Sequence, residues 1–177
     1  MTRTENFDLS TRNTFRMKAK CALYIEYDTV DELKSIDPQS LPQPIMHIGA
    51  GSNLLFTGDF PGTVLHSNVK FLKFVDMGLD EVLMTVGAGV VFDDFVSRSC
   101  EAGLWGAENL SLIPGEVGAA AVQNIGAYGV EAKDIIAGVV DMLCHNGLDL
   151  FQEPLVGLAG DNDGGVEGLR RIKDLSL

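Results

Sequence analysis

The stretch "IPGEVGAAAVQNIGAYGVE", residues 113–131, is rich in glycine and alanine and carries only two charged side chains, both glutamates. It follows a well-patterned helical segment, yet its own pattern predicts neither a helix nor a strand. A folded protein keeps so pliable a stretch where its backbone must approach another group closely. We therefore expect a flat group and an anionic group to lie against this part of the chain.

The same stretch offers a surface suited to a planar ring. Ile113 and Pro114 provide a flat apolar face, and Gln123 and Asn124 bring amide donors and acceptors into an otherwise apolar loop. Its glycines are spaced too irregularly for a repeat, at positions 115, 118, 126 and 129. An apolar shelf with interleaved N–H donors suits a heteroaromatic ring with polar edges, such as a flavin. The alternative is that the stretch is only a tightly packed connector.

A second glycine-rich segment, "GAGSNLLF" (49–56), directly follows an apolar run that predicts a buried strand. Gly49 and Gly51 permit positive φ angles and let backbone N–H groups converge on a phosphate, with Ser52 and Asn53 as additional donors. The segment is not a Walker loop, since no Gly-Lys-Ser/Thr follows, and it lacks the third glycine of a GxGxxG fingerprint. Alone, it is equally compatible with a structural turn after a strand.

Together the two segments make a stronger argument than either does alone. One offers a phosphate cradle, the other offers a ring shelf, and each belongs to a different lobe of the chain. We therefore predict that a dinucleotide flavin lies in the cleft between two lobes of mixed α and β structure.

The first lobe is predicted to span residues 13–67 with the order βαββ. Its helix and three strands are expected at 29–36, 21–27, 45–49 and 62–67. Thr29 can cap the first turn of the helix. Residues 37–44 are punctuated by prolines and predict a loop. Residues 1–12 are polar and show no periodicity, so we expect a mobile lead-in.

The second lobe is predicted to span residues 68–147, which makes the fold class α+β. It should contain a hairpin, a helix and a further strand, at 69–89, 90–104 and 135–147. Asp93 and Asp94 favour the first turn of the helix electrostatically, and Gly103 provides its C-terminal stop. Residues 148–177 are left as an unassigned tail.

The composition excludes several functional classes. The 177 residues carry a formal net charge of −12, which repels phosphate backbones and anionic membranes, so we expect no nucleic-acid or membrane partner. No apolar run is long enough to span a membrane. Cysteines at positions 21, 100 and 144 are widely spaced and odd in number, which argues against disulfides and a metal site and fits a reducing cytoplasm. We expect all three to be buried.

Four segments carry a resemblance to a known family. They are "NTF" (13–15), "GAGSNLL" (49–55), "VGAG" (86–89) and "ENLSLIPGEVGAAAVQNIGAYGVE" (108–131). In this order and spacing they resemble the UDP-N-acetylenolpyruvoylglucosamine reductase (MurB) family, over roughly residues 10–147. The resemblance implies a two-lobed FAD-binding domain of the vanillyl-alcohol-oxidase (PCMH) type, with FAD held non-covalently. It also implies a bacterial cytoplasmic enzyme of peptidoglycan synthesis, in which NADPH reduces the flavin and the flavin reduces UDP-N-acetylglucosamine enolpyruvate to UDP-N-acetylmuramate.

The resemblance also implies which residues contact FAD. The pyrophosphate loop corresponds to Ile48, Gly49, Ala50, Gly51, Ser52, Asn53, Leu54 and Leu55. The segment against the flavin ring corresponds to Ile113, Pro114, Gly115, Val117 and Gly118, and its continuation to Gln123, Asn124, Gly126, Ala127 and Tyr128. Tyr128 is also compatible with a packed tyrosine whose hydroxyl is bonded. Replacing Gly51 with valine is expected to abolish FAD binding without unfolding the chain.

Some residues depart from the family pattern or stand outside it. Ala121 occupies a position where the family usually has proline, which should loosen the loop slightly. Glu116 stands where small residues are usual, and facing a flavin it would disfavour the anionic reduced form, so we expect it to point to solvent. His47 is expected to be a satisfied core residue, and His66 and His145 to be incidental.

The substrate-binding half of the family is not recognisable in this sequence. We find no "YR(D/T)S", "GS(F/V)FKNP" or late "EV" motif, which in the family supply an arginine, a serine proton donor and a glutamate. We therefore assign no catalytic residue and no oligomeric state. Three interpretations stay open: a truncated reductase, a stand-alone FAD-binding module, or a non-functional remnant whose C-terminal half a frameshift replaced. In each, apolar surface near Ile113 and Val122 is expected to be exposed.

Overall fold

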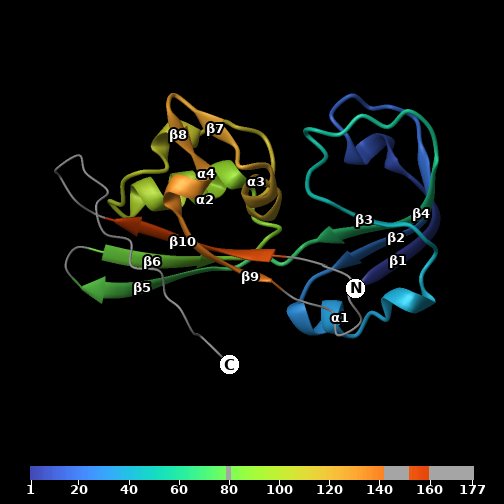
Figure 1. The fold of residues 1–177 in the computed structure, drawn as a ribbon, viewed down its shortest axis with the longest axis horizontal. Coiled ribbons are helices and arrows are strands. Elements are labelled where there is room, and N and C mark those ends of the chain that lie inside the picture. The colour runs from blue at the N-terminus through green and yellow to red at the C-terminus, as the bar shows by residue number, and fades with distance from the viewer. Residues whose placement is uncertain (79–80, 142–151, 160–177) are drawn as a thin grey trace.

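The computed structural model describes residues 1–78, 81–141 and 152–159, and Figure 1 shows two lobes lying side by side. Each lobe is built around its own four-stranded sheet. Helices and strands occur in both lobes, as the predicted α+β class requires. Within the described ranges, no helix is both long enough and apolar enough to cross a membrane.

The first lobe has the predicted order of strand, helix, strand and strand, preceded by an additional strand. Its strands are β1 (Thr2–Asp8), β2 (Lys20–Tyr27), β3 (Ile45–Ile48) and β4 (Phe60–Ser67), and its helical segments are α1 (Val30–Lys34) and the 3-10 turns Leu9–Arg12 and Pro38–Ser40. The sheet order is β1-β2-β4-β3, with β1 antiparallel to β2 and the other pairs parallel. Thr29 caps α1 as predicted, because its hydroxyl accepts the backbone N–H of Glu32 at 3.1 Å.

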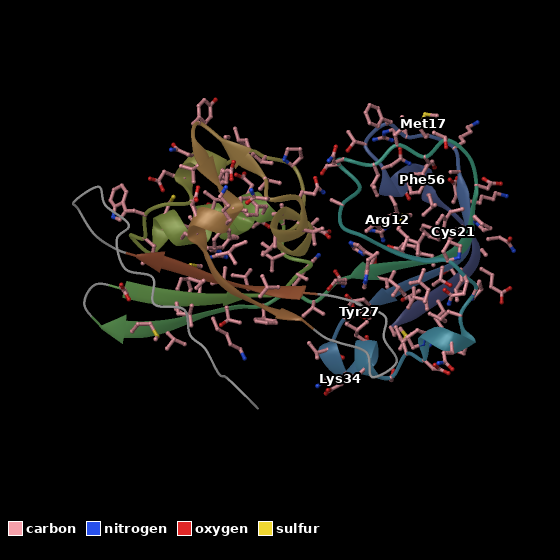
Figure 2. All side chains as sticks on the ribbon, viewed as in Figure 1. Arg12, Met17, Cys21, Tyr27, Lys34 and Phe56 are labelled. Atoms are coloured by element: carbon pink, nitrogen blue, oxygen red, sulfur yellow. The ribbon has the colours of Figure 1, made fainter. Side chains whose placement is uncertain are left out.

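Both faces of the first sheet are covered, which explains the continuous apolar runs of its inner strands. Figure 2 shows Tyr27 on the α1 side of the sheet and Cys21 and Phe56 on the opposite side. Val64 and Leu65 are adjacent on β4 and lie fully buried in these two separate cores, because neighbouring side chains of a strand point to opposite faces. The sheet is therefore a firmly packed base for the loop that follows β3.

Residues 2–8 form an edge strand, so the prediction of a mobile lead-in over residues 1–12 is wrong. The strand pairs with β2, and Leu9 directly after it is fully buried. Most side chains of β1 are exposed, so the strand shows no alternation of apolar and polar residues. Hydrogen bonds between the main chains hold it to β2, and a pattern of side chains does not reveal these bonds.

The second lobe is an antiparallel sheet with helices packed against one of its faces (Figure 1). Its strands are β5 (Leu72–Gly78), β6 (Glu81–Val86), β9 (Ile136–Asp141) and β10 (Gln152–Ala159), in the order β5-β6-β10-β9. The other elements are α2 (Phe92–Glu101), the 3-10 turn Glu108–Leu110, α3 (Val117–Gln123), α4 (Ala132–Ile135) and a small hairpin of β7 (Gly126–Ala127) and β8 (Val130–Glu131). The pairing of β5 with β6 confirms the predicted hairpin, whose turn at 79–80 lies outside the described residues.

α2 lies where the change of hydrophobic period predicts a helix. Phe92, Phe95 and Val96 are buried and pack in one core with Met84 of β6. Gly103 follows the helix with a φ angle of 74°, in the left-handed region that favours glycine, and this confirms the predicted stop.

Two segments of the second lobe differ from the sequence predictions. Residues 117–123 form α3 inside the stretch predicted to be neither helix nor strand, because alanine is the best helix former and most of the glycines lie outside these residues. Residues 152–159, predicted to belong to a tail, form β10 between β6 and β9. The sequence does not predict this strand, because Pro154 lies within it and proline is unusual inside a sheet.

The cysteine prediction is confirmed at one position and wrong at another. Cys21 is 1% exposed in the first lobe, as expected for a small apolar residue. Cys100 is exposed near the end of α2, because its position lies off the apolar face of this helix. The strand predicted over 135–147 is described only as far as residue 141. Cys144 and His145 lie outside the described residues.

Candidate ligand-binding site

A cavity of about 500 Å³ lies where the two lobes meet. Its first-lobe wall consists of β3, the glycine-rich loop that follows and the end of β4. Its second-lobe wall consists of Ala88, Glu116 and the exposed face of α3. The complete lining is Ile45, His47, Ile48, Gly49, Ala50, Gly51, Ser52, Asn53, Leu54, Ser67, Ala88, Glu116, Gly118, Ala119, Val122 and Gln123.

Contacts within the protein require a glycine at position 51. Its φ angle is 71°, and a Cβ atom there would lie 2.0 Å from the carbonyl oxygen of Arg12. Its own carbonyl accepts the backbone N–H of Thr14 at 3.2 Å. The loop after β3 is therefore packed against the "NTF" segment. This corrects the expected effect of Gly51→Val, because valine would disturb the fold as well as any ligand.

Two further glycines allow close packing around α3, Gly49 between the lobes and Gly118 within the second lobe. A Cβ atom on Gly49 would lie 2.8 Å from the Cβ atom of Ala119, and one on Gly118 would lie 2.8 Å from that of Ala88. The backbone N–H of Gly118 donates to the carbonyl of Ala88 at 3.0 Å. The small side chains at these positions therefore bring α3 against both the glycine-rich loop and the "VGAG" segment.

Side-chain hydrogen bonds join the two glycine-rich segments directly. The hydroxyl of Ser52 donates to the carbonyl of Pro114 at 2.9 Å. The side-chain amide of Asn53 donates to Oε1 of Gln123, also at 2.9 Å. The structure therefore brings together the two segments that the sequence analysis assigned to one ligand, although more than sixty residues separate them in the chain.

The cavity brings together only some of the residues predicted to bind the ligand. It is lined by Ile48, Gly49, Ala50, Gly51, Ser52, Asn53, Leu54, Gly118 and Gln123. The remaining predicted residues do not line it: Leu55, Ile113, Pro114, Gly115, Val117, Asn124, Gly126, Ala127 and Tyr128. Val117 is buried in the core of the second lobe. Tyr128 is 90% exposed between β7 and β8, which excludes the packed tyrosine considered as its alternative.

Glu116 lies in the wall of the cavity, so the prediction that it points to solvent is wrong. The residue is only 9% exposed, and its two carboxylate oxygens lie 3.1 and 3.2 Å from Nε2 of His66. His66 is 4% exposed and was predicted to be incidental, which is also wrong. A charged residue inside an alanine- and glycine-rich stretch is the one sequence signal of a buried partner, but it does not identify His66 on the other lobe.

The hydrogen-bonded contacts of His66 continue into the first lobe through Glu26. Nδ1 of His66 lies 2.9 Å from Oε2 of Glu26, and the same oxygen accepts from Arg12 at 2.7 Å and from the Tyr24 hydroxyl at 3.2 Å. Burial alone would raise the pKa of Glu26, but the hydrogen bond with His66 and the charge of Arg12 hold this pKa below its usual value. Glu26 is therefore an ionised carboxylate at neutral pH.

His47 is the other ionisable side chain of the cavity wall. Its Nε2 atom lies 3.2 Å from the hydroxyl of Tyr27, in agreement with the predicted core histidine. Burial lowers the pKa of His47 well below its usual value, and the electrostatic influence of His66 adds to this effect. His47 is therefore neutral at physiological pH.

Comparisons with known proteins agree with this geometry. Residues 23–147 match the family model described as FAD binding domain. The chain is 51% identical over 136 residues to the UDP-N-acetylenolpyruvoylglucosamine reductase of Bacteroides fragilis and 44% identical over 137 residues to that of Porphyromonas gingivalis. Each alignment covers 76% of this chain but only 41% and 40% of the relatives. The chain thus spans about two fifths of the length of these curated relatives.

A solved structure shows the same fold. The chain superposes on UDP-N-acetylenolpyruvylglucosamine reductase (MurB) from Thermus caldophilus with a TM-score of 0.63 and 24% sequence identity. The superposition covers 89% of this chain and 60% of that chain. Because the superposition covers more of the chain than residues 23–147 alone, the shared fold is not limited to the segment that matches the family model.

Proposed function

Because the chain belongs to the FAD-binding domain family, we propose that it binds FAD non-covalently in the cavity between its two lobes. The size of the cavity, about 500 Å³, lies within the usual range of ligand pockets. Its lining combines apolar side chains with a small number of polar groups, as sites for aromatic ligands usually do. The cavity therefore fits the chemistry of a dinucleotide that has a flat ring and a pyrophosphate.

The loop after β3 would hold the pyrophosphate. Among the described residues, no hydrogen bond engages the backbone N–H groups of Ser52 and Asn53, so both remain available to an anion. Backbone donors explain how a chain with a net charge of −12 can hold a phosphate without a lysine. On the opposite wall, Ala119 and Val122 of α3 leave apolar surface for the ring.

The names of the relatives suggest the reaction that this cofactor serves. We propose that the chain is the cofactor-holding part of a reductase acting on UDP-N-acetylglucosamine enolpyruvate in the bacterial cytoplasm, with NADPH as the hydride donor. When bound, FAD would supply the capacity to accept and deliver a hydride. The free thiols of Cys21 and Cys100 are consistent with a reducing compartment.

The residues that line the cavity are better suited to binding a cofactor and excluding water than to transferring a proton. The ionisable side chains that line the cavity are His47 and Glu116, and each is already hydrogen-bonded to a protein group. A general acid must reach the atom that it protonates, and both groups are held by partners within the protein. We therefore assign neither as the acid of the reductase.

Titration of the purified chain with FAD tests the binding proposal. We expect saturable binding with a Kd of about 1 μM or weaker, which corresponds to roughly 8 kcal/mol, with a shift of the flavin absorption spectrum. Ala50→Trp, which places a large side chain on an exposed cavity-lining residue, should weaken binding about tenfold or more. Thr57→Trp is the matched control, because Thr57 is exposed in the same loop but does not line the cavity.

Two results would reject the proposal. The first is a chain that is folded by circular dichroism yet causes no spectral shift in excess FAD. The second is equal loss of affinity in both tryptophan variants, which would place the bound flavin elsewhere on the molecule.

A further inference from the structure

A row of four ionisable groups runs from the first lobe to the wall of the cavity, half-buried at its start and buried at its end. It consists of Arg12, Glu26, His66 and Glu116, joined by contacts of 2.7, 2.9 and 3.1 Å, and Figure 2 labels Arg12 at its start. Glu116 lines the cavity and His66 does not, so the row meets the cavity at Glu116. The contact between His66 and Glu116 also joins the two lobes.

The hydrogen-bond geometry of His66 ties its charge to the ionisation of its two carboxylate partners. An ionised carboxylate can only accept hydrogen bonds, so each ring nitrogen that faces one must carry a proton. Nδ1 faces Glu26 and Nε2 faces both oxygens of Glu116. With both carboxylates ionised, both nitrogens are donors and the ring is an imidazolium.

We propose that His66 is a positively charged positioning residue of the FAD site, which holds the Glu116 carboxylate in the cavity wall and neutralises it. This inference rests on the proposed FAD-binding function. The two cations and two anions of the row balance one another. Without the charge on His66, the row would carry a net negative charge beside the cavity, where the pyrophosphate of FAD would be repelled.

The neighbouring groups leave this balance unchanged. The Tyr24 hydroxyl also contacts Glu26, and its ring lies 6.4 Å from that of His66, but burial raises the pKa of this hydroxyl, so it stays neutral. His47 on the adjacent strand is neutral because burial lowers its pKa. One other arrangement fits the same distances: a neutral His66 whose Nε2 accepts a hydrogen bond from a protonated Glu116.

Nitrogen NMR of the FAD-free chain distinguishes the two arrangements. In ¹⁵N-labelled protein at pH 7, we expect the side chain of His66 to show two protonated nitrogens with similar shifts. His47 is the internal comparison and should show the unequal shifts of a neutral ring. His66→Gln and His47→Gln variants assign the signals. A neutral pattern for His66 would overturn the charge assignment and with it the proposal.

FAD titration of three variants tests the consequence for binding. His66→Gln leaves Glu116 without its cation, and we expect affinity to fall by about tenfold or more, or roughly 1.4 kcal/mol. Adding Glu116→Gln removes the uncompensated charge, so the double variant should recover most of this loss. Glu116→Gln alone removes an anion from the cavity wall and leaves the His66 cation, so this variant should bind FAD more tightly than the wild type.

A purely structural role predicts a different pattern. If the double variant, still folded by circular dichroism, binds FAD as weakly as His66→Gln or more weakly, the electrostatic role is excluded. Failure of the wild-type chain to bind FAD would reject the proposed function and the link of His66 to the cofactor. The NMR experiment would still decide the charge of His66, because it does not involve FAD.

Discussion

Gly51 shows how one residue can serve both the fold and a ligand. Its positive φ angle turns the chain after β3, and its lack of a side chain admits the carbonyl of Arg12. The same turn directs the backbone of Ser52 and Asn53 into the cavity. The phosphate cradle therefore depends on packing against the first lobe, and the two roles of this glycine cannot be separated by a bulky substitution.

Gly51→Ala is expected to lower the free energy of unfolding by about 2–4 kcal/mol, from the strained φ angle and the clash with Arg12 together. Chemical denaturation of the FAD-free chain measures this effect. The control is Gly58→Ala, because a Cβ atom on Gly58 would meet nothing within 4 Å, and its effect should stay within about 0.5 kcal/mol. Equal midpoints for the two variants would show that the loop can move away from Arg12.

Among the elements, α2 is connected to the segment before α3 by a backbone hydrogen bond from Phe92 to Gly115 and by the side chain of Asp93. The carboxylate of Asp93 accepts the backbone N–H of Leu112 at 2.7 Å and the hydroxyl of Ser111 at 2.8 Å. Leu112 has a φ angle of 63° and is 81% exposed, so little packing holds it in this unusual conformation. Asp93 was predicted only to favour the first turn of the helix, but it also fixes the approach of the chain to the cavity.

The hydrogen bonds from Leu112 and Ser111 lower the pKa of Asp93 below its usual value of 3.8. Its contribution to stability is therefore complete above pH 3.8 and is lost as the pH falls through the lower pKa of the folded state. We expect Asp93→Asn to be less stable than the wild type at pH 7 and to lose less stability than the wild type on further acidification.

Urea denaturation at pH 7 and in steps below pH 4 measures this difference. Asp94→Asn is the control, since Asp94 lies in the same turn of α2 but makes no hydrogen bond or ion pair to the described residues. If Asp93→Asn and Asp94→Asn lose stability in parallel on acidification, the Asp93 contacts do not fix the turn.

Elements with strong local patterns were predictable from the sequence, and those defined by distant contacts were not. The period of α2 and the hairpin of β5 and β6 follow from residues close together in the chain. β1 and β10 form because they pair with strands that are distant in the sequence, whereas the glycines around α3 conceal its alanine-rich helix. The same reason explains the site: the loop after β3 was predictable, whereas the pairing of His66 with Glu116 joins residues fifty positions apart.

At the scale of the whole molecule, the two lobes line one cavity together, and the chain spans about two fifths of the length of the relatives. A reductase needs a positioned acid in addition to its cofactor, and such a group contributes on the order of 10²–10⁴-fold to the rate. No cavity-lining residue has been assigned this role, so the sequence-based expectation that no catalytic residue is recognisable stays a prediction.

The chain supplied with FAD, NADPH and UDP-N-acetylglucosamine enolpyruvate is expected to form UDP-N-acetylmuramate at least about 100-fold more slowly than a full-length relative. Anaerobic assays that follow both NADPH loss and product formation measure this, with the Bacteroides fragilis enzyme as the reference. NADPH consumption that rises when oxygen is admitted would confirm that the flavin is functional. Product formation at the rate of the reference would show that an acid in this chain has been overlooked.

The contact between His66 and Glu116 has a consequence for the evolutionary history of this chain. With the charges proposed above, each residue offsets the electrostatic penalty of burying the other, so the loss of either one leaves an unbalanced charge in the interior. Descendants that lose one member should therefore soon lose the other. Across an alignment of related sequences, histidine at position 66 should accompany an acidic residue at position 116, and a small residue at 116 should accompany an uncharged one at 66.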